Sequence, residues 1–111
     1  MILVGSRALM FRFPALLGRK PADYDFIAYR NEALSWLSKH SITDFEEIDG
    51  KIIAKNEPSP IEFELADNKP SSQMLIELVK ADPKTISTEF GMVPNLNILF
   101  ALKKSHRYLK N

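Results

Sequence analysis

Residues 2–29 read ILVGSRALMFRFPALLGRKPADYDFIAY. The stretch holds two short apolar runs, each typical of a buried strand, on either side of a segment rich in Leu, Ala, Phe and Met that favours a helix. The first run, 2–4, stops at Gly5-Ser6, and the second carries Asp-Tyr-Asp at 23–25. Residues two apart on a strand share a face, so we expect the two aspartates to project side by side from one edge of a sheet.

The carboxylates of Asp23 and Asp25 would repel each other at this spacing unless a cation lies between them. Carboxylate oxygens are hard ligands that suit Mg²⁺ or Mn²⁺, and phosphoryl-transfer enzymes use such ions to hold the attacking and leaving oxygens. The pair therefore points to a metal site used in catalysis or nucleotide binding. The alternative is an exposed polar edge in which one aspartate caps the turn after Pro21.

The composition sets limits on the class of protein. The chain has 111 residues, enough for one compact domain, and its 45% apolar and 26% charged residues are those of a globular protein. A net charge of +1 gives no overall field that would attract nucleic acid, and the absence of cysteine excludes disulfides, thiolate zinc sites and cysteine nucleophiles. No signal peptide or membrane-spanning run is recognisable, so we expect a cytoplasmic protein without a membrane partner.

The rest of the chain alternates between helical and extended patterns. Apolar spacing and turn residues predict helices over 7–17, 32–40 and 71–80, and strands over 23–29, 42–48, 51–55 and 61–65. Asp49-Gly50 predicts a tight turn, and a break at 91–94 separates a last helix with Pro94 in its first turn. This order predicts a single α/β (α+β) domain over 1–111, a mixed β-sheet flanked by helices that pack on one side of it.

The segment IEFEL at 61–65 supplies further carboxylates. Its residues alternate, with Ile61 and Phe63 on one face and Glu62 and Glu64 on the other. A strand of this kind beside the Asp-Tyr-Asp strand would add a third carboxylate to the pair. The alternative is the solvent face of an amphipathic strand, which we expect to hold for one of the two glutamates, since a single third carboxylate suffices.

These motifs together resemble the nucleotidyltransferase superfamily, which has the fold of DNA polymerase beta and its small relatives. The family pattern is a strand ending in Gly-Ser, a helix, a strand bearing Asp-x-Asp, and a third carboxylate on a later neighbouring strand. The matching pieces here are Gly5-Ser6, Asp23-x-Asp25, and Glu62 or Glu64. The resemblance covers roughly the first two thirds of the chain, and NILFALKKSHRYLKN at 97–111 looks like a helix of nucleotidyltransferases encoded by bacteriophages.

The resemblance implies a nucleotide-binding role for the turn after the first strand. The turn would receive the phosphates of a nucleoside triphosphate, because Gly5 lets the backbone approach closely, Ser6 offers a hydroxyl and a helix N-terminus favours an anion. Arg7 and Lys104 are the cationic residues that we expect to bind substrate. The stretch between this turn and the Asp pair is longer than in many minimal members of the family.

The resemblance also implies the metal ligands and the reaction. Asp23 and Asp25 would hold Mg²⁺ (or Mn²⁺), and the third carboxylate would share a metal and help to deprotonate or orient an acceptor hydroxyl. Both Glu62 and Glu64 are candidates, and we prefer Glu64 because it lies deeper in its strand and farther from Pro60. The expected activity is metal-dependent transfer of a nucleotidyl group from a nucleoside triphosphate to a hydroxyl on RNA, a protein or a small molecule.

Two other functions stay open at this point. One is a catalytically inactive nucleotidyltransferase-like module that acts as a binding or antitoxin-type protein. The other is a nucleic-acid-binding domain that uses the basic edge of the last helix, made of Lys103, Lys104, Arg107 and Lys110. The binding module would depend on a protein partner. The nucleic-acid-binding domain would bind nucleic acid with an affinity that falls steeply as the salt concentration rises.

An apolar stripe runs along the last helix to the end of the sequence. It consists of Leu96, Leu99, Leu102, His106 and Leu109, at helical spacing. Such a stripe needs something to cover it. We therefore expect a homo-oligomer, or a longer protein whose C-terminal region completes the substrate cleft.

Overall fold

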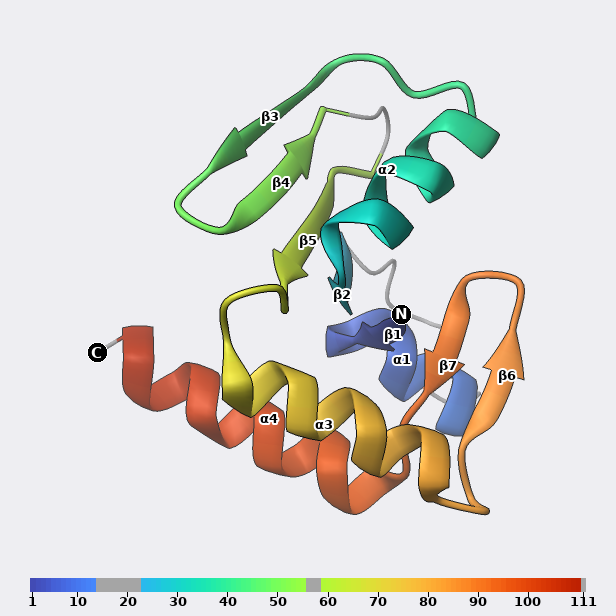
Figure 1. The fold of residues 1–111 in the computed structure, drawn as a ribbon. Coiled ribbons are helices and arrows are strands. Elements are labelled where there is room, and N and C mark those ends of the chain that lie inside the picture. The colour runs from blue at the N-terminus through green and yellow to red at the C-terminus, as the bar shows by residue number, and fades with distance from the viewer. Residues whose placement is uncertain (14–22, 56–58, 111) are drawn as a thin grey trace.

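One mixed β-sheet runs through the molecule, with helices packed against both of its faces (Figure 1). The structure is a computed structural model and describes residues 1–13, 23–55 and 59–110. The strands in this part of the chain are β1 (Ile2–Val4), β2 (Tyr24–Ala28), β3 (Phe45–Ile48), β4 (Lys51–Ala54), β5 (Ile61–Leu65), β6 (Ile86–Thr88) and β7 (Gly91–Val93). The helices are α1 (Gly5–Arg12), α2 (Arg30–Lys39), α3 (Pro70–Ala81) and α4 (Leu96–Lys110).

The strands lie in the order β3-β4-β5-β2-β1-β7-β6. The central strand, β2, is antiparallel to β1 and parallel to β5. β1 is parallel to β7, whereas β3, β4 and β5 are antiparallel neighbours. The mixed α/β sheet predicted from the sequence is therefore confirmed. Within the predicted helix over 7–17, α1 ends at Arg12, and residues 14–17 lie outside the described residues.

Side chains of β2 alternate between two apolar cores, one on each face of the sheet. Phe26 belongs to the core under α2, where its ring centroid lies 5.3 Å from that of Trp36. Ile27 belongs to the other core, to which α3 contributes Ile76 and Val79. The expectation that all helices pack on one side of the sheet is therefore wrong. Continuous apolar runs such as those of β1 and β2 are typical of strands buried on both faces.

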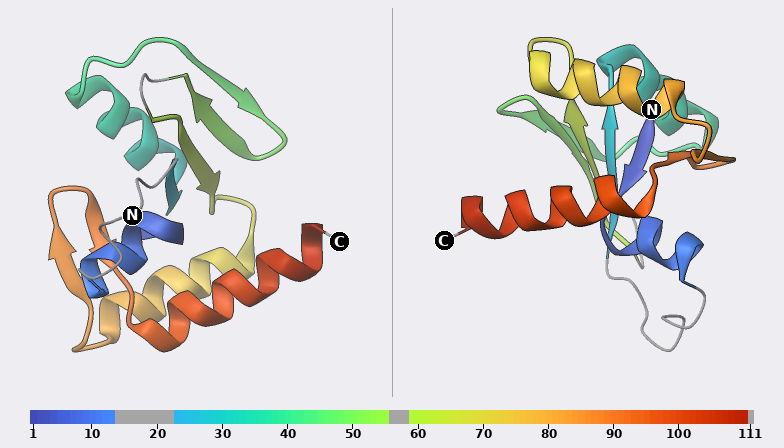
Figure 2. Two further views of the ribbon diagram at one scale, coloured as in Figure 1. Left: turned by 180° about the vertical axis from the view of Figure 1, so that it is seen from behind. Right: turned by 90° about the horizontal axis from the view of Figure 1, so that it is seen from below.

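The last helix, α4, packs against α1. Leu99 is only 3% exposed and shares a core with Leu9 of α1. Farther along, the C-terminal end of α4 extends away from the strands (Figure 2). Within the described residues, no helix has the combination of length and apolar composition that crossing a bilayer requires.

The predicted turn at Asp49-Gly50 is confirmed. Both residues have positive φ, 49° for Asp49 and 75° for Gly50, as a two-residue hairpin requires, and they join the antiparallel strands β3 and β4. Pro70 occupies the start of α3, where its fixed φ suits the first helical turn.

The hairpin of β6 and β7 is absent from the sequence-based expectations. Where a break was expected at 91–94, β7 extends the sheet and pairs Met92 with Ile2 of β1. Pro94 is buried and precedes α4, which begins at Leu96, so its expected place in the first helical turn is wrong.

Arg12 holds α1 against this hairpin. Its guanidinium donates hydrogen bonds to the main-chain oxygens of Lys84, Val93 and Pro94. One side chain therefore joins the end of α1 to the segments that lead into β6 and α4, and so helps to fix the angle at which α4 leaves the sheet.

Asn95 connects the start of α4 to the end of α3. Its side-chain oxygen accepts a hydrogen bond from the N–H of Ile98, and its amide nitrogen donates to Asp82 Oδ2 at 2.5 Å. Hydrogen bonds from the backbone of Lys84 and from the Asn95 side chain hold the pKa of Asp82 below its ordinary value of 3.8. This carboxylate therefore contributes its stabilisation above that ordinary value, and the contribution is lost as the pH falls through the lower pKa of the folded state.

We predict that Asn95→Ala lowers the free energy of unfolding by about 1 kcal/mol, the usual cost of losing an N-cap side chain. Asn97→Ala, at an exposed position of the same helical turn, should change it by less than about 0.5 kcal/mol. Urea denaturation at neutral pH measures both values. Equal effects of the two substitutions would mean that the contacts of Asn95 do not fix α4.

Candidate active-site pocket

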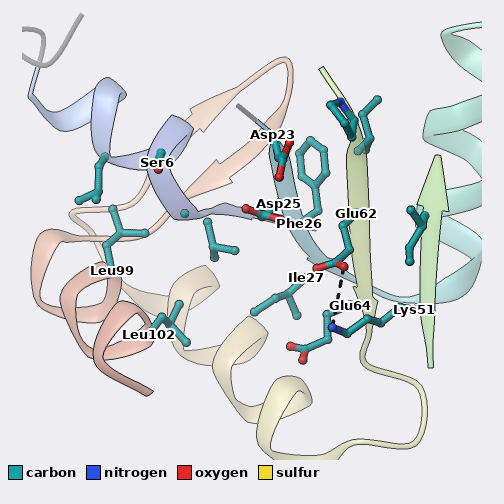
Figure 3. Close-up of a pocket in the computed structure, with 16 residues that line it drawn as sticks. Ser6, Asp23, Asp25, Phe26, Ile27, Lys51, Glu62, Glu64, Leu99 and Leu102 are labelled. Atoms are coloured by element: carbon teal, nitrogen blue, oxygen red, sulfur yellow. Dashed lines mark ion pairs between the residues drawn. The ribbon is translucent and has the colours of Figure 1, made fainter. Parts of the chain in front are cut away.

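A pocket of about 490 Å³ lies where the turn between β1 and α1 meets β2, β4, β5 and α4 (Figure 3). Four carboxylates line it, those of Asp23, Asp25, Glu62 and Glu64. Leu99 and Leu102 of α4 line it across from Glu62 and Glu64 (Figure 3). The pocket thus brings together all four carboxylates selected from the sequence, together with Gly5 and Ser6.

Gly5 and Asp25 approach each other closely at one side of this pocket. Gly5 has a φ of +73°, and a Cβ atom built on it would lie 2.8 Å from Asp25 Oδ2. A side chain at position 5 would force the Asp25 carboxylate to move, and glycine adopts this backbone conformation without strain. The Gly-Ser turn predicted from the sequence therefore lies directly beside the second aspartate of the Asp-Tyr-Asp motif.

The register between β2 and β5 decides which glutamate lies level with the aspartates. The strands are parallel, with Asp25 paired with Glu62 and Ile27 paired with Glu64. Partners in register project from the same face, so Glu62 is the neighbour of Asp25 across the two strands. The expected third carboxylate, Glu64, lies level with Ile27 instead. The register therefore favours Glu62 over Glu64 as the carboxylate beside Asp25.

Each of the two glutamates is accompanied by a lysine. The Lys51 ammonium, on β4, lies 3.8 Å from Glu62 Oε1 (Figure 3), and the Lys69 ammonium, at the start of α3, lies 2.7 Å from Glu64 Oε1. The shorter contact is also a hydrogen bond. Lys51 lines the pocket and was not selected from the sequence, because its role depends on the pairing of β4 with β5.

The donor set can be compared with what a divalent cation requires. Within the described residues, no three acidic or histidine side chains converge closely enough to hold a metal ion together. Mg²⁺, however, commonly keeps several water molecules and is held by one or two carboxylates together with substrate phosphates. Asp25 and Glu62, adjacent across two strands, fit this second mode, and Asp23, just before β2, lines the same pocket.

Two cationic residues expected to bind substrate lie elsewhere. The guanidinium of Arg7 lies 3.6 Å from the centroid of the Tyr24 ring and donates a hydrogen bond of 2.8 Å to the hydroxyl of Ser59. These contacts hold the end of the β4–β5 connection against β2, and Arg7 does not line the pocket. Lys104 is exposed on α4 and does not line it either. The side chains of Lys103, Arg107 and Lys110 lie outside the described part of the structure.

The fold and the pocket define a mixed α/β protein with a carboxylate-lined pocket beside a Gly-Ser turn. The chain belongs to DUF7277, a family described as a domain of unknown function, whose model matches residues 1–79. This range includes Gly5, Ser6 and all four carboxylates of the pocket, whereas α4, which supplies Leu99 and Leu102, follows it. No curated protein and no solved structure matches the chain.

We predict that Gly5→Ala destabilises the protein more than Gly50→Ala does. Both glycines have a φ near +75°, but a Cβ atom at Gly50 would meet nothing within 4 Å. The change at Gly50 should therefore cost only the backbone strain, roughly 1 kcal/mol, whereas the contact with Asp25 should add about 1–3 kcal/mol at Gly5.

A double-mutant cycle with Asp25→Ala isolates that contact. In the Asp25→Ala background, where the carboxylate is gone, the additional cost of Gly5→Ala should disappear. Urea denaturation of the single and double variants measures the coupling. If Gly5→Ala and Gly50→Ala cost the same in the unsubstituted chain, the close approach of Gly5 to Asp25 does not constrain the site.

Proposed function

We propose that this protein is a metal-dependent nucleotidyltransferase that moves a nucleotidyl group from a nucleoside triphosphate to a hydroxyl acceptor. The observation that carries the proposal is the position of Asp25, which lies against Gly5 on one side and level with Glu62 on the other. The motif order of the resemblance, Gly-Ser, Asp-x-Asp and a later carboxylate, supports it, since all these elements line one pocket.

The start of α1 is suited to an anion. The first N–H groups of a helix have no partner within the helix, and the helix dipole favours negative charge there. The N-cap residue, Val4, makes no side-chain capping hydrogen bond, and the first turn contains no acidic residue. The N–H groups of the Gly5-Ser6 turn would therefore bind the terminal phosphates of a triphosphate.

The carboxylates would hold Mg²⁺ or Mn²⁺ that enters with the triphosphate. Asp25 and Glu62 are partners in register, and Asp23, which directly precedes β2, lines the same pocket. The ion would supply positive charge that offsets the charge of the phosphate oxygens. In the transfer itself, the acceptor oxygen forms a bond to the α-phosphorus, the bond to pyrophosphate breaks, and a carboxylate accepts the hydroxyl proton.

The apolar part of the lining suits the remainder of a nucleotide. Leu99 and Leu102 of α4 face the pocket across from the acidic strands (Figure 3). A base or sugar packed on these side chains would leave the phosphates near Gly5 and the carboxylates. A nucleotide has a charged end and a flat apolar end. The acidic side of the pocket, with its metal ion, would suit the first, and the apolar side would suit the second.

A second candidate function is that of a nucleotidyltransferase-like binding module without turnover. It is favoured by the lysines beside Glu62 and Glu64, and by the absence, within the described residues, of three convergent ligands for a metal ion. Such a module would bind a nucleotide or a protein partner but would transfer no nucleotidyl group. Substitution of the carboxylates would therefore change nothing in an assay of transfer.

We predict that Mg²⁺ with a non-hydrolysable nucleoside triphosphate raises the melting temperature, and that Glu62→Gln removes this shift. A ligand at a hundred times its dissociation constant stabilises the native state by about 2.7 kcal/mol. Glu64→Gln is the matched control, because Glu64 lies level with Ile27 and contacts Lys69, and it should keep the shift. Differential scanning fluorimetry with each nucleotide measures the effect.

An assay of transfer then separates the two candidate functions. The protein is incubated with each labelled nucleoside triphosphate, Mg²⁺ or Mn²⁺, and total cellular RNA and protein. Label that appears on RNA or protein with the unsubstituted chain, and not with Asp25→Asn, supports the transferase. A thermal shift without transferred label favours the binding module, and the absence of both contradicts nucleotide binding at this pocket.

A further inference from the structure

Lys51 is the single cationic side chain among the described residues that line the acidic pocket. It lies on β4, directly opposite Glu64 in the antiparallel pairing with β5, while Glu62 is opposite Ile53. The ammonium nevertheless contacts Glu62, the residue diagonal to it (Figure 3). The carboxylate directly opposite Lys51 is contacted by Lys69 instead.

The two lysine–glutamate contacts differ in closeness. Lys69 and Glu64 make a hydrogen-bonded ion pair of 2.7 Å, whereas Lys51 and Glu62 are separated by 3.8 Å, near the outer limit for an ion pair. Both lysine side chains are about half exposed, so neither pair contributes much to stability. The looser contact is the one in which both residues line the pocket, and its lysine has a long flexible side chain that can take a new partner.

We propose that Lys51 exchanges partners when the pocket is loaded. In the empty pocket it offsets the charge of Glu62. When a divalent cation takes that carboxylate, Lys51 is released and binds the phosphate oxygens of the triphosphate, which carry more negative charge than one such ion neutralises. This inference rests on the function proposed above, and it assigns the triphosphate contact to Lys51 in place of Arg7 and Lys104.

The exchange has opposite consequences for two ligands. Lys51 competes with a cation for Glu62, so its removal should strengthen binding of a metal ion by itself. The same removal should weaken binding of a phosphate chain, because a charge-assisted contact is lost. A residue with a merely structural role would weaken both. The two affinities, measured separately, therefore distinguish partner exchange from support of the fold.

Lys51→Met keeps the apolar stem of the side chain and removes its charge, and Lys69→Met is the matched control outside the pocket lining. The probes are Mn²⁺ alone, followed by electron paramagnetic resonance, and inorganic tripolyphosphate with Mg²⁺, followed by calorimetry. For Lys51→Met we expect Mn²⁺ affinity to rise about two- to fivefold and tripolyphosphate affinity to fall about tenfold or more. Lys69→Met should change each by less than about twofold.

Lys51→Arg keeps the charge and should retain tripolyphosphate affinity within about threefold, which guards against a loss caused by misfolding of the methionine variant. If Lys51→Met behaves like Lys69→Met, or weakens both ligands, partner exchange is wrong while the proposed function stands. If the unsubstituted protein binds neither Mn²⁺ nor tripolyphosphate, the proposed function itself fails, and the role of Lys51 fails with it.

Discussion

The parallel pairing of β2 with β5 is the constraint on which the candidate site depends. On one face of these strands Phe26 and Phe63 are partners in register, and their rings stack with centroids 5.0 Å apart in the core under α2. On the other face, one residue earlier in each strand, Asp25 and Glu62 are partners in the pocket. A slip of one residue would exchange the faces of every side chain, so the buried aromatic pair also fixes the carboxylate pair.

The surroundings of Asp25 follow from this register. β1 pairs with β2 on the opposite edge from β5 and places Val4 beside Asp25, so that Gly5 begins its helix against the carboxylate. The pairing of the adjacent strands β1, β2 and β5 therefore fixes where Gly5 lies relative to Asp25 and Glu62. α4 is attached more indirectly, through the Arg12 and Asn95 contacts and the shared core of Leu9 and Leu99.

The sequence predicted the parts of this arrangement that local patterns encode. The alternation of IEFEL, the Asp-Gly turn and the Gly-Ser and Asp-x-Asp motifs all have local signals, and the structure brings these motifs to one pocket. The strands β6 and β7 have no comparable local signal, because each has only three residues and Gly91 and Pro94 are typical of breaks. Pairing with β1, which is remote in sequence, stabilises β7.

The choice between Glu62 and Glu64 could not be made from the sequence. The position of Lys51 in the pocket could not be predicted from it either. Both depend on how β5 aligns with β2 and with β4, and alignment between strands is set by packing across the core rather than by residues within one strand. Arg7 illustrates the same point, since its neighbours Tyr24 and Ser59 are distant in sequence and turn it away from the pocket.

Anomalous diffraction from crystals grown with Mn²⁺ and a non-hydrolysable nucleoside triphosphate tests the carboxylate site directly. We expect a manganese peak within about 2.0–2.3 Å of carboxylate oxygens of both Asp25 and Glu62, with the triphosphate reaching toward Gly5. A peak bound to Glu64 without Glu62, or a nucleotide bound away from the β2–β5 edge, would contradict this expectation.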